Sequence, residues 1–245
     1  GFSNVIPRLD RGIHTRQTRN PMSIAQWPTQ ERPREKLLSL GAAALSEAEL
    51  LAIFIRTGLP GKSAIDLARD LLTQFGNLNQ LFSANRDEFL AIPGLGKAKY
   101  AQLQAVLELN RRHLQEKLIQ GDILDSPDDV RAFLISKLGH RQRETFACLF
   151  LNHQHQLVKY QELFCGTLNH AEIYPREIAK SALAYNASAI IIAHNHPSGD
   201  VKPSQADISM TRELKIALAL LDVRILDHFV VGANQACSLV ELGRF

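Results

Sequence analysis

The apolar run AIII at residues 189–192 lies between two segments whose apolar residues recur with helical spacing. A short apolar run bounded by polar residues is typical of a buried strand. The flanking segments, 174–186 and 204–222, are predicted helices. Further strands are predicted on both sides of this region, at 144–152, 157–167, 223–232 and 236–243, and the first two flank a polar HQHQ turn as a hairpin. Alternating strands and helices of this kind indicate an α/β sheet covered by helices.

The first half of the chain has a different pattern, because helical spacing dominates from Pro33 to about Lys117. Ser46 with Glu49 forms a capping box ahead of one predicted helix, and Gly76 ends the next. We therefore divide the chain into four parts: a disordered extension (1–23), a small all-helical domain (24–117), a polar linker (118–127) and an α/β domain (128–245).

Composition and charge restrict the classes of protein to which this chain can belong. The net charge of +3 is accounted for by residues 1–21, which carry four arginines against one aspartate, so any nucleic-acid-binding face elsewhere must be local. No apolar run approaches the ~18 residues that a membrane helix needs. The three cysteines, Cys148, Cys165 and Cys237, are not spaced as metal ligands, and we predict buried thiols in a reducing compartment. We expect residues 1–21 to lie upstream of a start at Met22, and we expect a cytoplasmic protein without membrane contact.

The segment AHNHPSGDVKPSQAD directly follows the predicted apolar strand. Residues i and i+2 of a strand share a face, so His194 and His196 point the same way and Asn195 points away. The chain then turns, and a helix that begins near Ser204 carries Asp207 in its first turn, where the carboxylate can come back beside the two imidazoles. Two imidazoles and one carboxylate suit zinc, which takes four ligands and would keep one position for water.

Each of these features has an ordinary structural interpretation when it is taken alone. A His-x-His pair is more often a polar strand end than a ligand pair, and Ser204-x-x-Asp207 by itself is a capping box. The features coincide at one strand-to-helix junction. Because of this coincidence, we give the metal site the same weight as the ordinary structural interpretation.

The spacing of His194, His196, Ser204 and Asp207 resembles the metalloprotease signature called JAMM or MPN+, and the string HNHPSGDVKPSQAD resembles the RadC family of bacterial proteins, long labelled as DNA repair proteins. Asn195 stands where the general signature has serine or threonine. The similarity covers roughly residues 24–245. It implies a C-terminal JAMM/MPN domain with a mixed, deaminase-like sheet, and one Zn²⁺ per chain.

The resemblance also implies roles for side chains. The signature needs a glutamate that opens the first strand of the domain, and Glu144 matches that place, although spacing alone would not choose it over Glu162, Glu172 or Glu177. Zinc lowers the pKa of a bound water from about 15.7 to about 7. Glu144 then moves protons, and Ser204 donates a hydrogen bond to the developing oxyanion. The implied reaction is hydrolysis of an amide, peptide or isopeptide bond in a protein or peptide of unknown identity.

Other classes of function remain to be weighed. The letters HNH do not make a His-Asn-His nuclease, whose residues are spread over a ββα unit, and a zinc deaminase would need a C-x-x-C that this chain lacks. The stretch IPGLGKAKYAQL at 92–103 resembles a helix-hairpin-helix, in which Gly94 and Gly96 let backbone amides approach a DNA phosphate and Lys97 and Lys99 add charge. The alternative there is a tight interhelical turn. Weak, non-specific DNA binding is therefore a second prediction, and a non-enzymatic DNA-binding or repair adaptor with a structural metal site is the alternative function.

Overall fold

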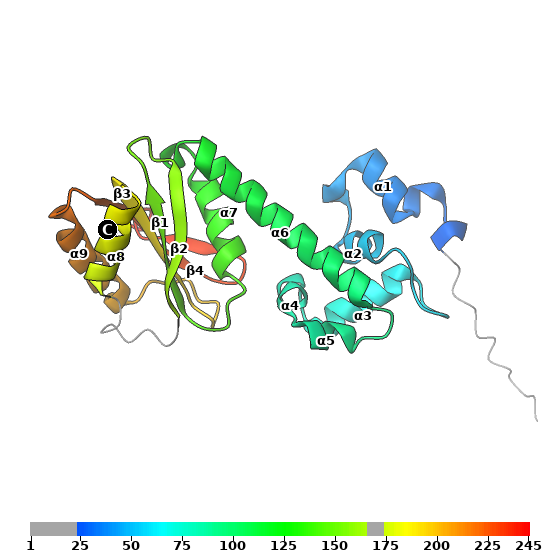
Figure 1. Ribbon diagram of the computed structural model, residues 1–245. Helices are drawn as coiled ribbons and strands as arrows, with labels where there is room; N and C mark the ends of the chain where they lie inside the picture. Colours follow the sequence, from blue (N-terminus) through cyan, green and yellow to red (C-terminus); the bar gives the residue numbers. More distant parts are fainter. Residues whose placement is uncertain (1–23, 166–173) are drawn as a thin grey trace, which may run out of the picture. The chain divides into compact units, whose positions relative to one another are not determined.

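The computed structural model describes residues 24–165 and 174–245 (Figure 1). The chain forms two compact units, residues 1–74 and 75–245. The predicted extension at 1–23 lies outside the described residues.

The named elements in the described part of the first unit are all helices. Its elements are η1 (Ile24–Gln26), η2 (Thr29–Glu31), α1 (Pro33–Leu40), η3 (Ala42–Ala44), α2 (Glu47–Ile55) and α3 (Ala64–Phe75). The predicted capping box at α2 is confirmed, because the Ser46 side chain accepts from the Glu49 backbone amide and the Glu49 carboxylate accepts from the Ser46 amide. α3 is followed by Gly76 with φ +85°, a conformation that favours glycine, so the predicted helix end is also confirmed.

Helices continue into the second unit. They are α4 (Leu78–Ser83), α5 (Arg86–Leu90), α6 (Lys97–Gln120), η4 (Ile123–Asp125) and α7 (Pro127–Leu138). Residues 118–127, predicted as a linker, hold the end of α6, all of η4 and the start of α7. Leu118 and Ile123 in this segment are buried in a core cluster that also includes α7 and the sheet. The segment thus contributes to the fold of the second unit, and the domain boundary itself stays a prediction.

The second unit contains a mixed five-stranded sheet in the order β2-β1-β3-β4-β5. Its strands are β1 (Thr145–Leu151), β2 (Leu157–Cys165), β3 (Ala189–Asn195), β4 (Arg224–Val231) and β5 (Ala236–Ser238). Only the β3–β4 pair is parallel, and the other pairs are antiparallel. The predicted α/β fold class, the β1–β2 hairpin and the buried apolar strand are confirmed. The last predicted strand, 236–243, is wrong in extent, because the chain turns after Ser238, where Leu242 and Gly243 donate to Ser238 and Val240.

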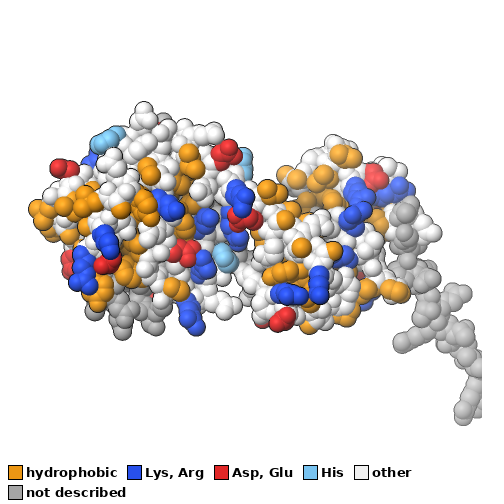
Figure 2. All heavy atoms as spheres, in the orientation of Figure 1, with side chains coloured by type: hydrophobic (Ala, Val, Ile, Leu, Met, Phe, Trp, Pro, Cys, Tyr) orange, Lys and Arg blue, Asp and Glu red, His pale blue; other side chains and the backbone are white. Residues whose placement is uncertain are grey.

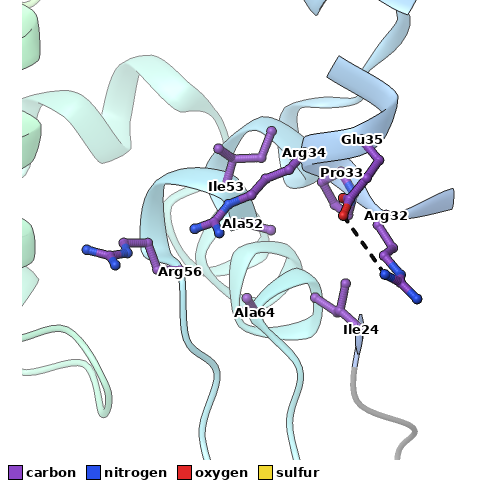
Figure 3. A pocket seen from close by; sticks show the side chains of 9 residues that line it. All are labelled: Ile24, Arg32, Pro33, Arg34, Glu35, Ala52, Ile53, Arg56 and Ala64. Carbon is purple, nitrogen blue, oxygen red and sulfur yellow. Dashed lines mark ion pairs between the residues drawn. The ribbon is translucent and has the colours of Figure 1, made fainter. Parts of the chain in front are cut away.

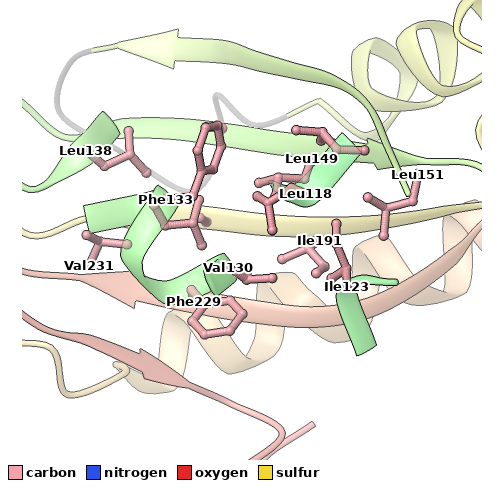
Figure 4. Close-up of a cluster of buried hydrophobic side chains, with 14 of the residues drawn as sticks. Leu118, Ile123, Val130, Phe133, Leu138, Leu149, Leu151, Ile191, Phe229 and Val231 are labelled. Atoms are coloured by element: carbon pink, nitrogen blue, oxygen red, sulfur yellow. The ribbon is translucent and has the colours of Figure 1, made fainter. Parts of the chain in front are cut away.

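Helices cover both faces of the sheet (Figure 1). On one face α7 packs against alternate strand residues, and this cluster includes Val130, Phe133, Leu138, Leu149, Ile191 and Phe229 (Figure 4). On the other face lie α8 (Pro175–Ala184) and α9 (Gln205–Ala219), and that cluster includes Phe146, Phe150, Ile178, Ile192, Leu214 and Leu218. The alternation of strand side chains between two helical layers explains why β1 and β3 are buried along their whole length.

Two further predictions meet the structure here. All three cysteines are free thiols, but only Cys148 is buried, while Cys165 is exposed and Cys237 is half-buried. The prediction of buried thiols is therefore wrong for the last two, because Cys165 ends the edge strand β2 and Cys237 lies in the edge strand β5. Among the helices of the described residues, none has both the length and the apolar character needed to cross a bilayer.

Candidate metal centre

His194 lies near the end of β3, on the face of the sheet that α8 and α9 cover. Its antiparallel partner on β1 is Phe146, and residues directly opposite each other in a sheet point to the same side. Phe146 belongs to the core cluster on the α8–α9 face. Glu144 immediately precedes β1 and lies two residues before Phe146. The β1–β3 register therefore brings Glu144 to the end of the sheet where His194 lies.

The structure brings His194, His196 and Asp207 together, and each offers a ligand atom within 4.8 Å of the others. The Nε2 atoms of His194 and His196 are 3.0 Å apart. The Asp207 carboxylate approaches His194 Nε2 to 3.4 Å and His196 Nε2 to 4.0 Å. His194 is 1% exposed and Asp207 7% exposed, whereas His196 is half-buried. Such a group could hold a metal ion.

Asn195 is not part of this group. Its side-chain oxygen accepts from the Thr145 backbone amide at 2.8 Å, and its side-chain nitrogen donates to the backbone oxygens of Arg141 and Arg143. These contacts tie the end of β3 to the segment that precedes β1. As the strand pattern predicted, the side chain between the two histidines turns away from them, and it holds the segment that carries Glu144.

Asp207 is held by the capping box of α9. The Ser204 backbone amide and the Ser204 hydroxyl both donate to Asp207 Oδ2 at 2.7 Å, and Ser204 Oγ accepts from the Asp207 amide at 3.1 Å. The other carboxylate oxygen, Oδ1, is the one that faces His194. The capping interpretation and the ligand interpretation of this pair are thus compatible, because the cap uses one oxygen and leaves the other directed at the imidazole.

His196 is oriented by the turn that follows β3. Its Nδ1 lies 2.6 Å from the Asp200 backbone oxygen. A carbonyl oxygen can only accept a hydrogen bond, so Nδ1 carries the proton and donates. A neutral His196 therefore has an unprotonated Nε2, and this lone pair is directed toward His194 and Asp207.

Sequence reasoning missed His228 and Thr211, which lie directly behind the group. His228 on β4 is fully buried, and its Nε2 is 2.8 Å from His194 Nδ1. Its Nδ1 is 2.6 Å from the Thr211 hydroxyl, which donates to the Asp207 backbone oxygen at 2.6 Å. Burial, and then the neighbouring His194 and His196, lower the pKa of His228 well below 6.5. The sequence did contain a signal for Thr211, because this residue follows Asp207 by four positions and therefore shares its helix face.

The other glutamates upstream of the histidines have different surroundings. Glu162 on β2 accepts from Arg141 at 2.7 Å, and Glu177 in the first turn of α8 is exposed beside Arg176. Glu172 lies outside the described residues. Of the four candidates, Glu144, Glu162 and Glu177 lie in the described residues, and Glu144 is the one that the β1–β3 register brings to the His194 end of β3.

The glycine turn proposed for DNA contacts precedes α6. Gly94 has φ +86°, and Gly96 is the N-cap of α6 and gives its first turn no side-chain cap. Lys97 and Lys99 lie in that first turn, and Lys99 Nζ donates to the Gly94 backbone oxygen at 2.8 Å. The structure therefore uses Lys99 to close the turn, while the N-cap residue Gly96 offers the amides at the start of α6 no side-chain acceptor.

The fold and the site together define an α/β domain in which a His-x-His pair at a strand end meets an aspartate in the first turn of the following helix. A family model described as a RadC-like JAB domain matches residues 124–244, and one described as UPF0758 N-terminal matches residues 24–101. A UPF0758 protein of Ralstonia nicotianae is 60% identical over 91% of this chain and all of its own length. One of Cellvibrio japonicus is 58% identical over 91% of this chain and 99% of its own. The chain belongs to this UPF0758 family, which carries the RadC-like JAB domain.

Proposed function

We propose that the chain is a zinc-dependent hydrolase of the RadC type, which cleaves an amide or isopeptide bond in a protein or peptide. The observation that carries this proposal is the convergence of His194 Nε2, His196 Nε2 and the Asp207 carboxylate at separations of 3.0 to 4.0 Å. We place its action in the cytoplasm and in a DNA-associated setting. The free thiols support the proposed cytoplasmic location. The RadC-like domain supports the proposed DNA-associated setting.

The donor set fits one zinc ion per chain. Zinc–nitrogen bonds of about 2.0–2.1 Å in a tetrahedral site put two imidazole nitrogens about 3.3 Å apart, and the two Nε2 atoms here are 3.0 Å apart. His196 presents a lone pair rather than a proton, because its Nδ1–H is used by Asp200. His194, His196 and Asp207 would hold the ion and leave a fourth position.

Zinc bound there would supply Lewis acidity, which lowers the pKa of a bound water to about 7 and polarises a carbonyl oxygen. The chain supplies the proton transfers and the oxyanion contact. Glu144 accepts a proton from the attacking water and passes it to the leaving amine. Its position next to the end of β1 that pairs with His194 supports this role, because a base must lie within hydrogen-bond reach of the water.

Ser204 donates to the oxyanion that develops on the carbonyl. In the structure its hydroxyl donates to Asp207 Oδ2, and its own backbone amide donates to the same oxygen at the same distance of 2.7 Å. When the hydroxyl turns toward substrate, the amide still holds the carboxylate. Ser204 is exposed, so a substrate can reach it. One such oxyanion donor typically lowers the activation free energy by about 3 kcal/mol.

The test of this function is Glu144→Gln. The variant should keep the fold and the zinc but lose at least ~10²-fold in amide hydrolysis, the low end for general acid–base groups. A panel of peptides and isopeptide-linked proteins serves as substrate, and Glu177→Gln, which changes an exposed glutamate of α8, is the matched control. Cleavage that Glu144→Gln retains in full removes Glu144 from the mechanism. If zinc-loaded wild type cleaves no member of the panel, the adaptor becomes the better account.

A second candidate function is binding of nucleic acid by the first unit. Ion pairs occupy four of its described cations, in the pairs Arg32–Glu35, Lys36–Glu49, Lys62–Asp70 and Arg69–Asp66. The remaining two, Arg34 and Arg56, have no carboxylate partner among the described residues, and both line one pocket of about 340 Å³. Figure 3 shows them directed to one side of the pocket, while Arg32 and Glu35 pair on the other.

These two arginines form a local cationic site in the described part of the unit, where the other cations are paired with carboxylates, and a phosphate contact requires such a site. On the face seen in Figure 2, lysines and arginines are spread in small groups among apolar and acidic side chains. We therefore expect weak binding without sequence preference. Full-length protein should bind duplex or single-stranded DNA less as salt rises, and Arg34→Gln with Arg56→Gln should reduce the salt slope by about 2. The control is Arg69→Gln, which removes a paired arginine. Absence of binding at low salt contradicts this candidate.

A further inference from the structure

His228 and Thr211 form a buried relay between the backbone of Asp207 and the ring of His194. We propose that this relay fixes the tautomer of His194, so that its Nδ1 carries the proton and its Nε2 presents a lone pair to the metal position. His228 and Thr211 are positioning residues, since neither belongs to the group that would hold the zinc. The inference rests on the proposed zinc site for its purpose, but its geometry is independent of the metal.

The direction of the relay is set at one end by a carbonyl. The Asp207 backbone oxygen can only accept, so the Thr211 hydroxyl gives its single proton to it at 2.6 Å. Thr211 Oγ1 then has only lone pairs for the ring of His228. The contact of 2.6 Å to His228 Nδ1 therefore requires that Nδ1 carries a proton and donates.

The same reasoning about donors and acceptors applies to the two ring nitrogens of His228. Neutral imidazole carries one proton, so a His228 that is protonated at Nδ1 has a bare Nε2. His228 stays neutral because it is fully buried and because the hydrogen-bond partners of its ring among the described residues are Thr211 and His194, neither of which is a carboxylate. Its Nε2 must accept from His194 Nδ1 at 2.8 Å. His194 consequently has its proton on Nδ1 and its lone pair on Nε2.

Metal-binding histidines usually donate their other N–H to a carboxylate or a carbonyl. Here the acceptor is a second imidazole, and the relay returns to the residue that supplies the carboxylate. Asp207 faces His194 through Oδ1 at 3.4 Å, and its backbone oxygen ends the relay that starts at His194 Nδ1. The ligands from β3 and α9 are thus joined twice, once through the metal position and once through β4. This closed arrangement holds both ligands in place before the ion binds.

The direct test is the tautomer state of the metal-free protein. Long-range ¹H–¹⁵N spectra of full-length apoprotein at about pH 8 distinguish imidazoles protonated at Nδ1 from those protonated at Nε2. We expect His194 and His228 both to be protonated at Nδ1. A His194 protonated at Nε2 in the wild-type apoprotein overturns the proposal, and this measurement needs no variant.

Thr211→Val and Thr211→Ser form a matched pair. Valine has the shape of threonine but cannot accept from His228, so His228 can move its proton to Nε2 and turn His194 to the wrong tautomer. We expect Thr211→Val to lose about 10- to 100-fold in zinc affinity, the usual effect of removing an outer hydrogen-bond partner, in a chelator competition assay. Thr211→Ser keeps a hydroxyl and should keep the wild-type affinity. Equal affinity in Thr211→Val and Thr211→Ser contradicts the relay.

The failures of the relay and of the proposed function are distinguishable. Zinc binding with His194 protonated at Nε2 in the apoprotein contradicts the relay and leaves the zinc site standing. Nδ1 tautomers in a protein that binds no zinc support the relay and contradict the proposed function.

Discussion

Ser204→Ala separates the structural role of this serine from its proposed chemical role. The change removes the bond from the Asp207 amide to Ser204 Oγ and the bond from Ser204 Oγ to Asp207 Oδ2. It keeps the bond from the residue 204 amide to the same carboxylate oxygen. Loss of such an N-cap costs about 0.5–2 kcal/mol. The opening equilibrium of the first turn of α9 should therefore increase about 2- to 30-fold.

The chain offers a close control in the first unit. Ser63 and Asp66 form the same set of bonds at the start of α3, with Ser63 Oγ donating to Asp66 Oδ2 at 2.7 Å and accepting from the Asp66 amide at 3.1 Å. The carboxylates differ in burial, because the side chain of Asp66 is 43% exposed and that of Asp207 10%. Water can replace the lost hydroxyl at Asp66 more easily than at Asp207. Ser204→Ala should therefore cost more than Ser63→Ala.

Hydrogen exchange of metal-free protein measures both effects locally. Amides in the first turn of α9 should exchange faster in Ser204→Ala, amides in the first turn of α3 should do so in Ser63→Ala, and the ratio should be larger at α9. Zinc affinity should fall only in Ser204→Ala, and only modestly, because the amide still holds Asp207. If exchange at α9 is unchanged in Ser204→Ala, or if Ser63→Ala has the larger effect, the argument from burial of the Asp207 carboxylate is refuted.

Other predictions concern titration and thiol chemistry. Burial, and then Arg111 and Arg141, lower the pKa of His140 below 6.5. The unfolded chain takes up this proton near pH 6.5 and the folded chain only at lower pH, so the free energy of unfolding should fall as pH drops below 6.5. Arg111→Gln should raise the NMR titration midpoint of His140 without restoring 6.5, because burial remains; an unchanged midpoint contradicts the assignment. A thiol reagent should label exposed Cys165 in native protein and label Cys148, whose pKa burial raises, only after denaturation.

The sequence predicted the part of the site that lies close together along the chain. His194, His196, Ser204 and Asp207 fall within one strand, one turn and the first turn of one helix, so local periodicity was enough to place them on a common side. His228 was missed because its contact with His194 depends on the parallel pairing of β3 with β4, across a helix of fifteen residues. The spacing of residues along the sequence does not predict that register.

Helix α7 was missed for a different reason. Ser126 and Pro127 were interpreted as the end of a polar linker, but they start a helix, with proline at its first position and Asp128 and Asp129 in its first turn. Leu118 and Ile123 escaped notice because two apolar residues in a polar segment have no period. They are buried because they pack against the sheet and α7. These are tertiary contacts, which the local sequence pattern does not indicate.

Zinc content tests the central claim most directly. Full-length wild-type protein, dialysed and measured by elemental analysis, should hold about one zinc per chain, and His196→Ala should lose it. His153→Ala, which removes an exposed histidine from the turn between β1 and β2, is the control and should keep it. Equal zinc in the wild type and in His196→Ala would contradict the assignment of the metal centre.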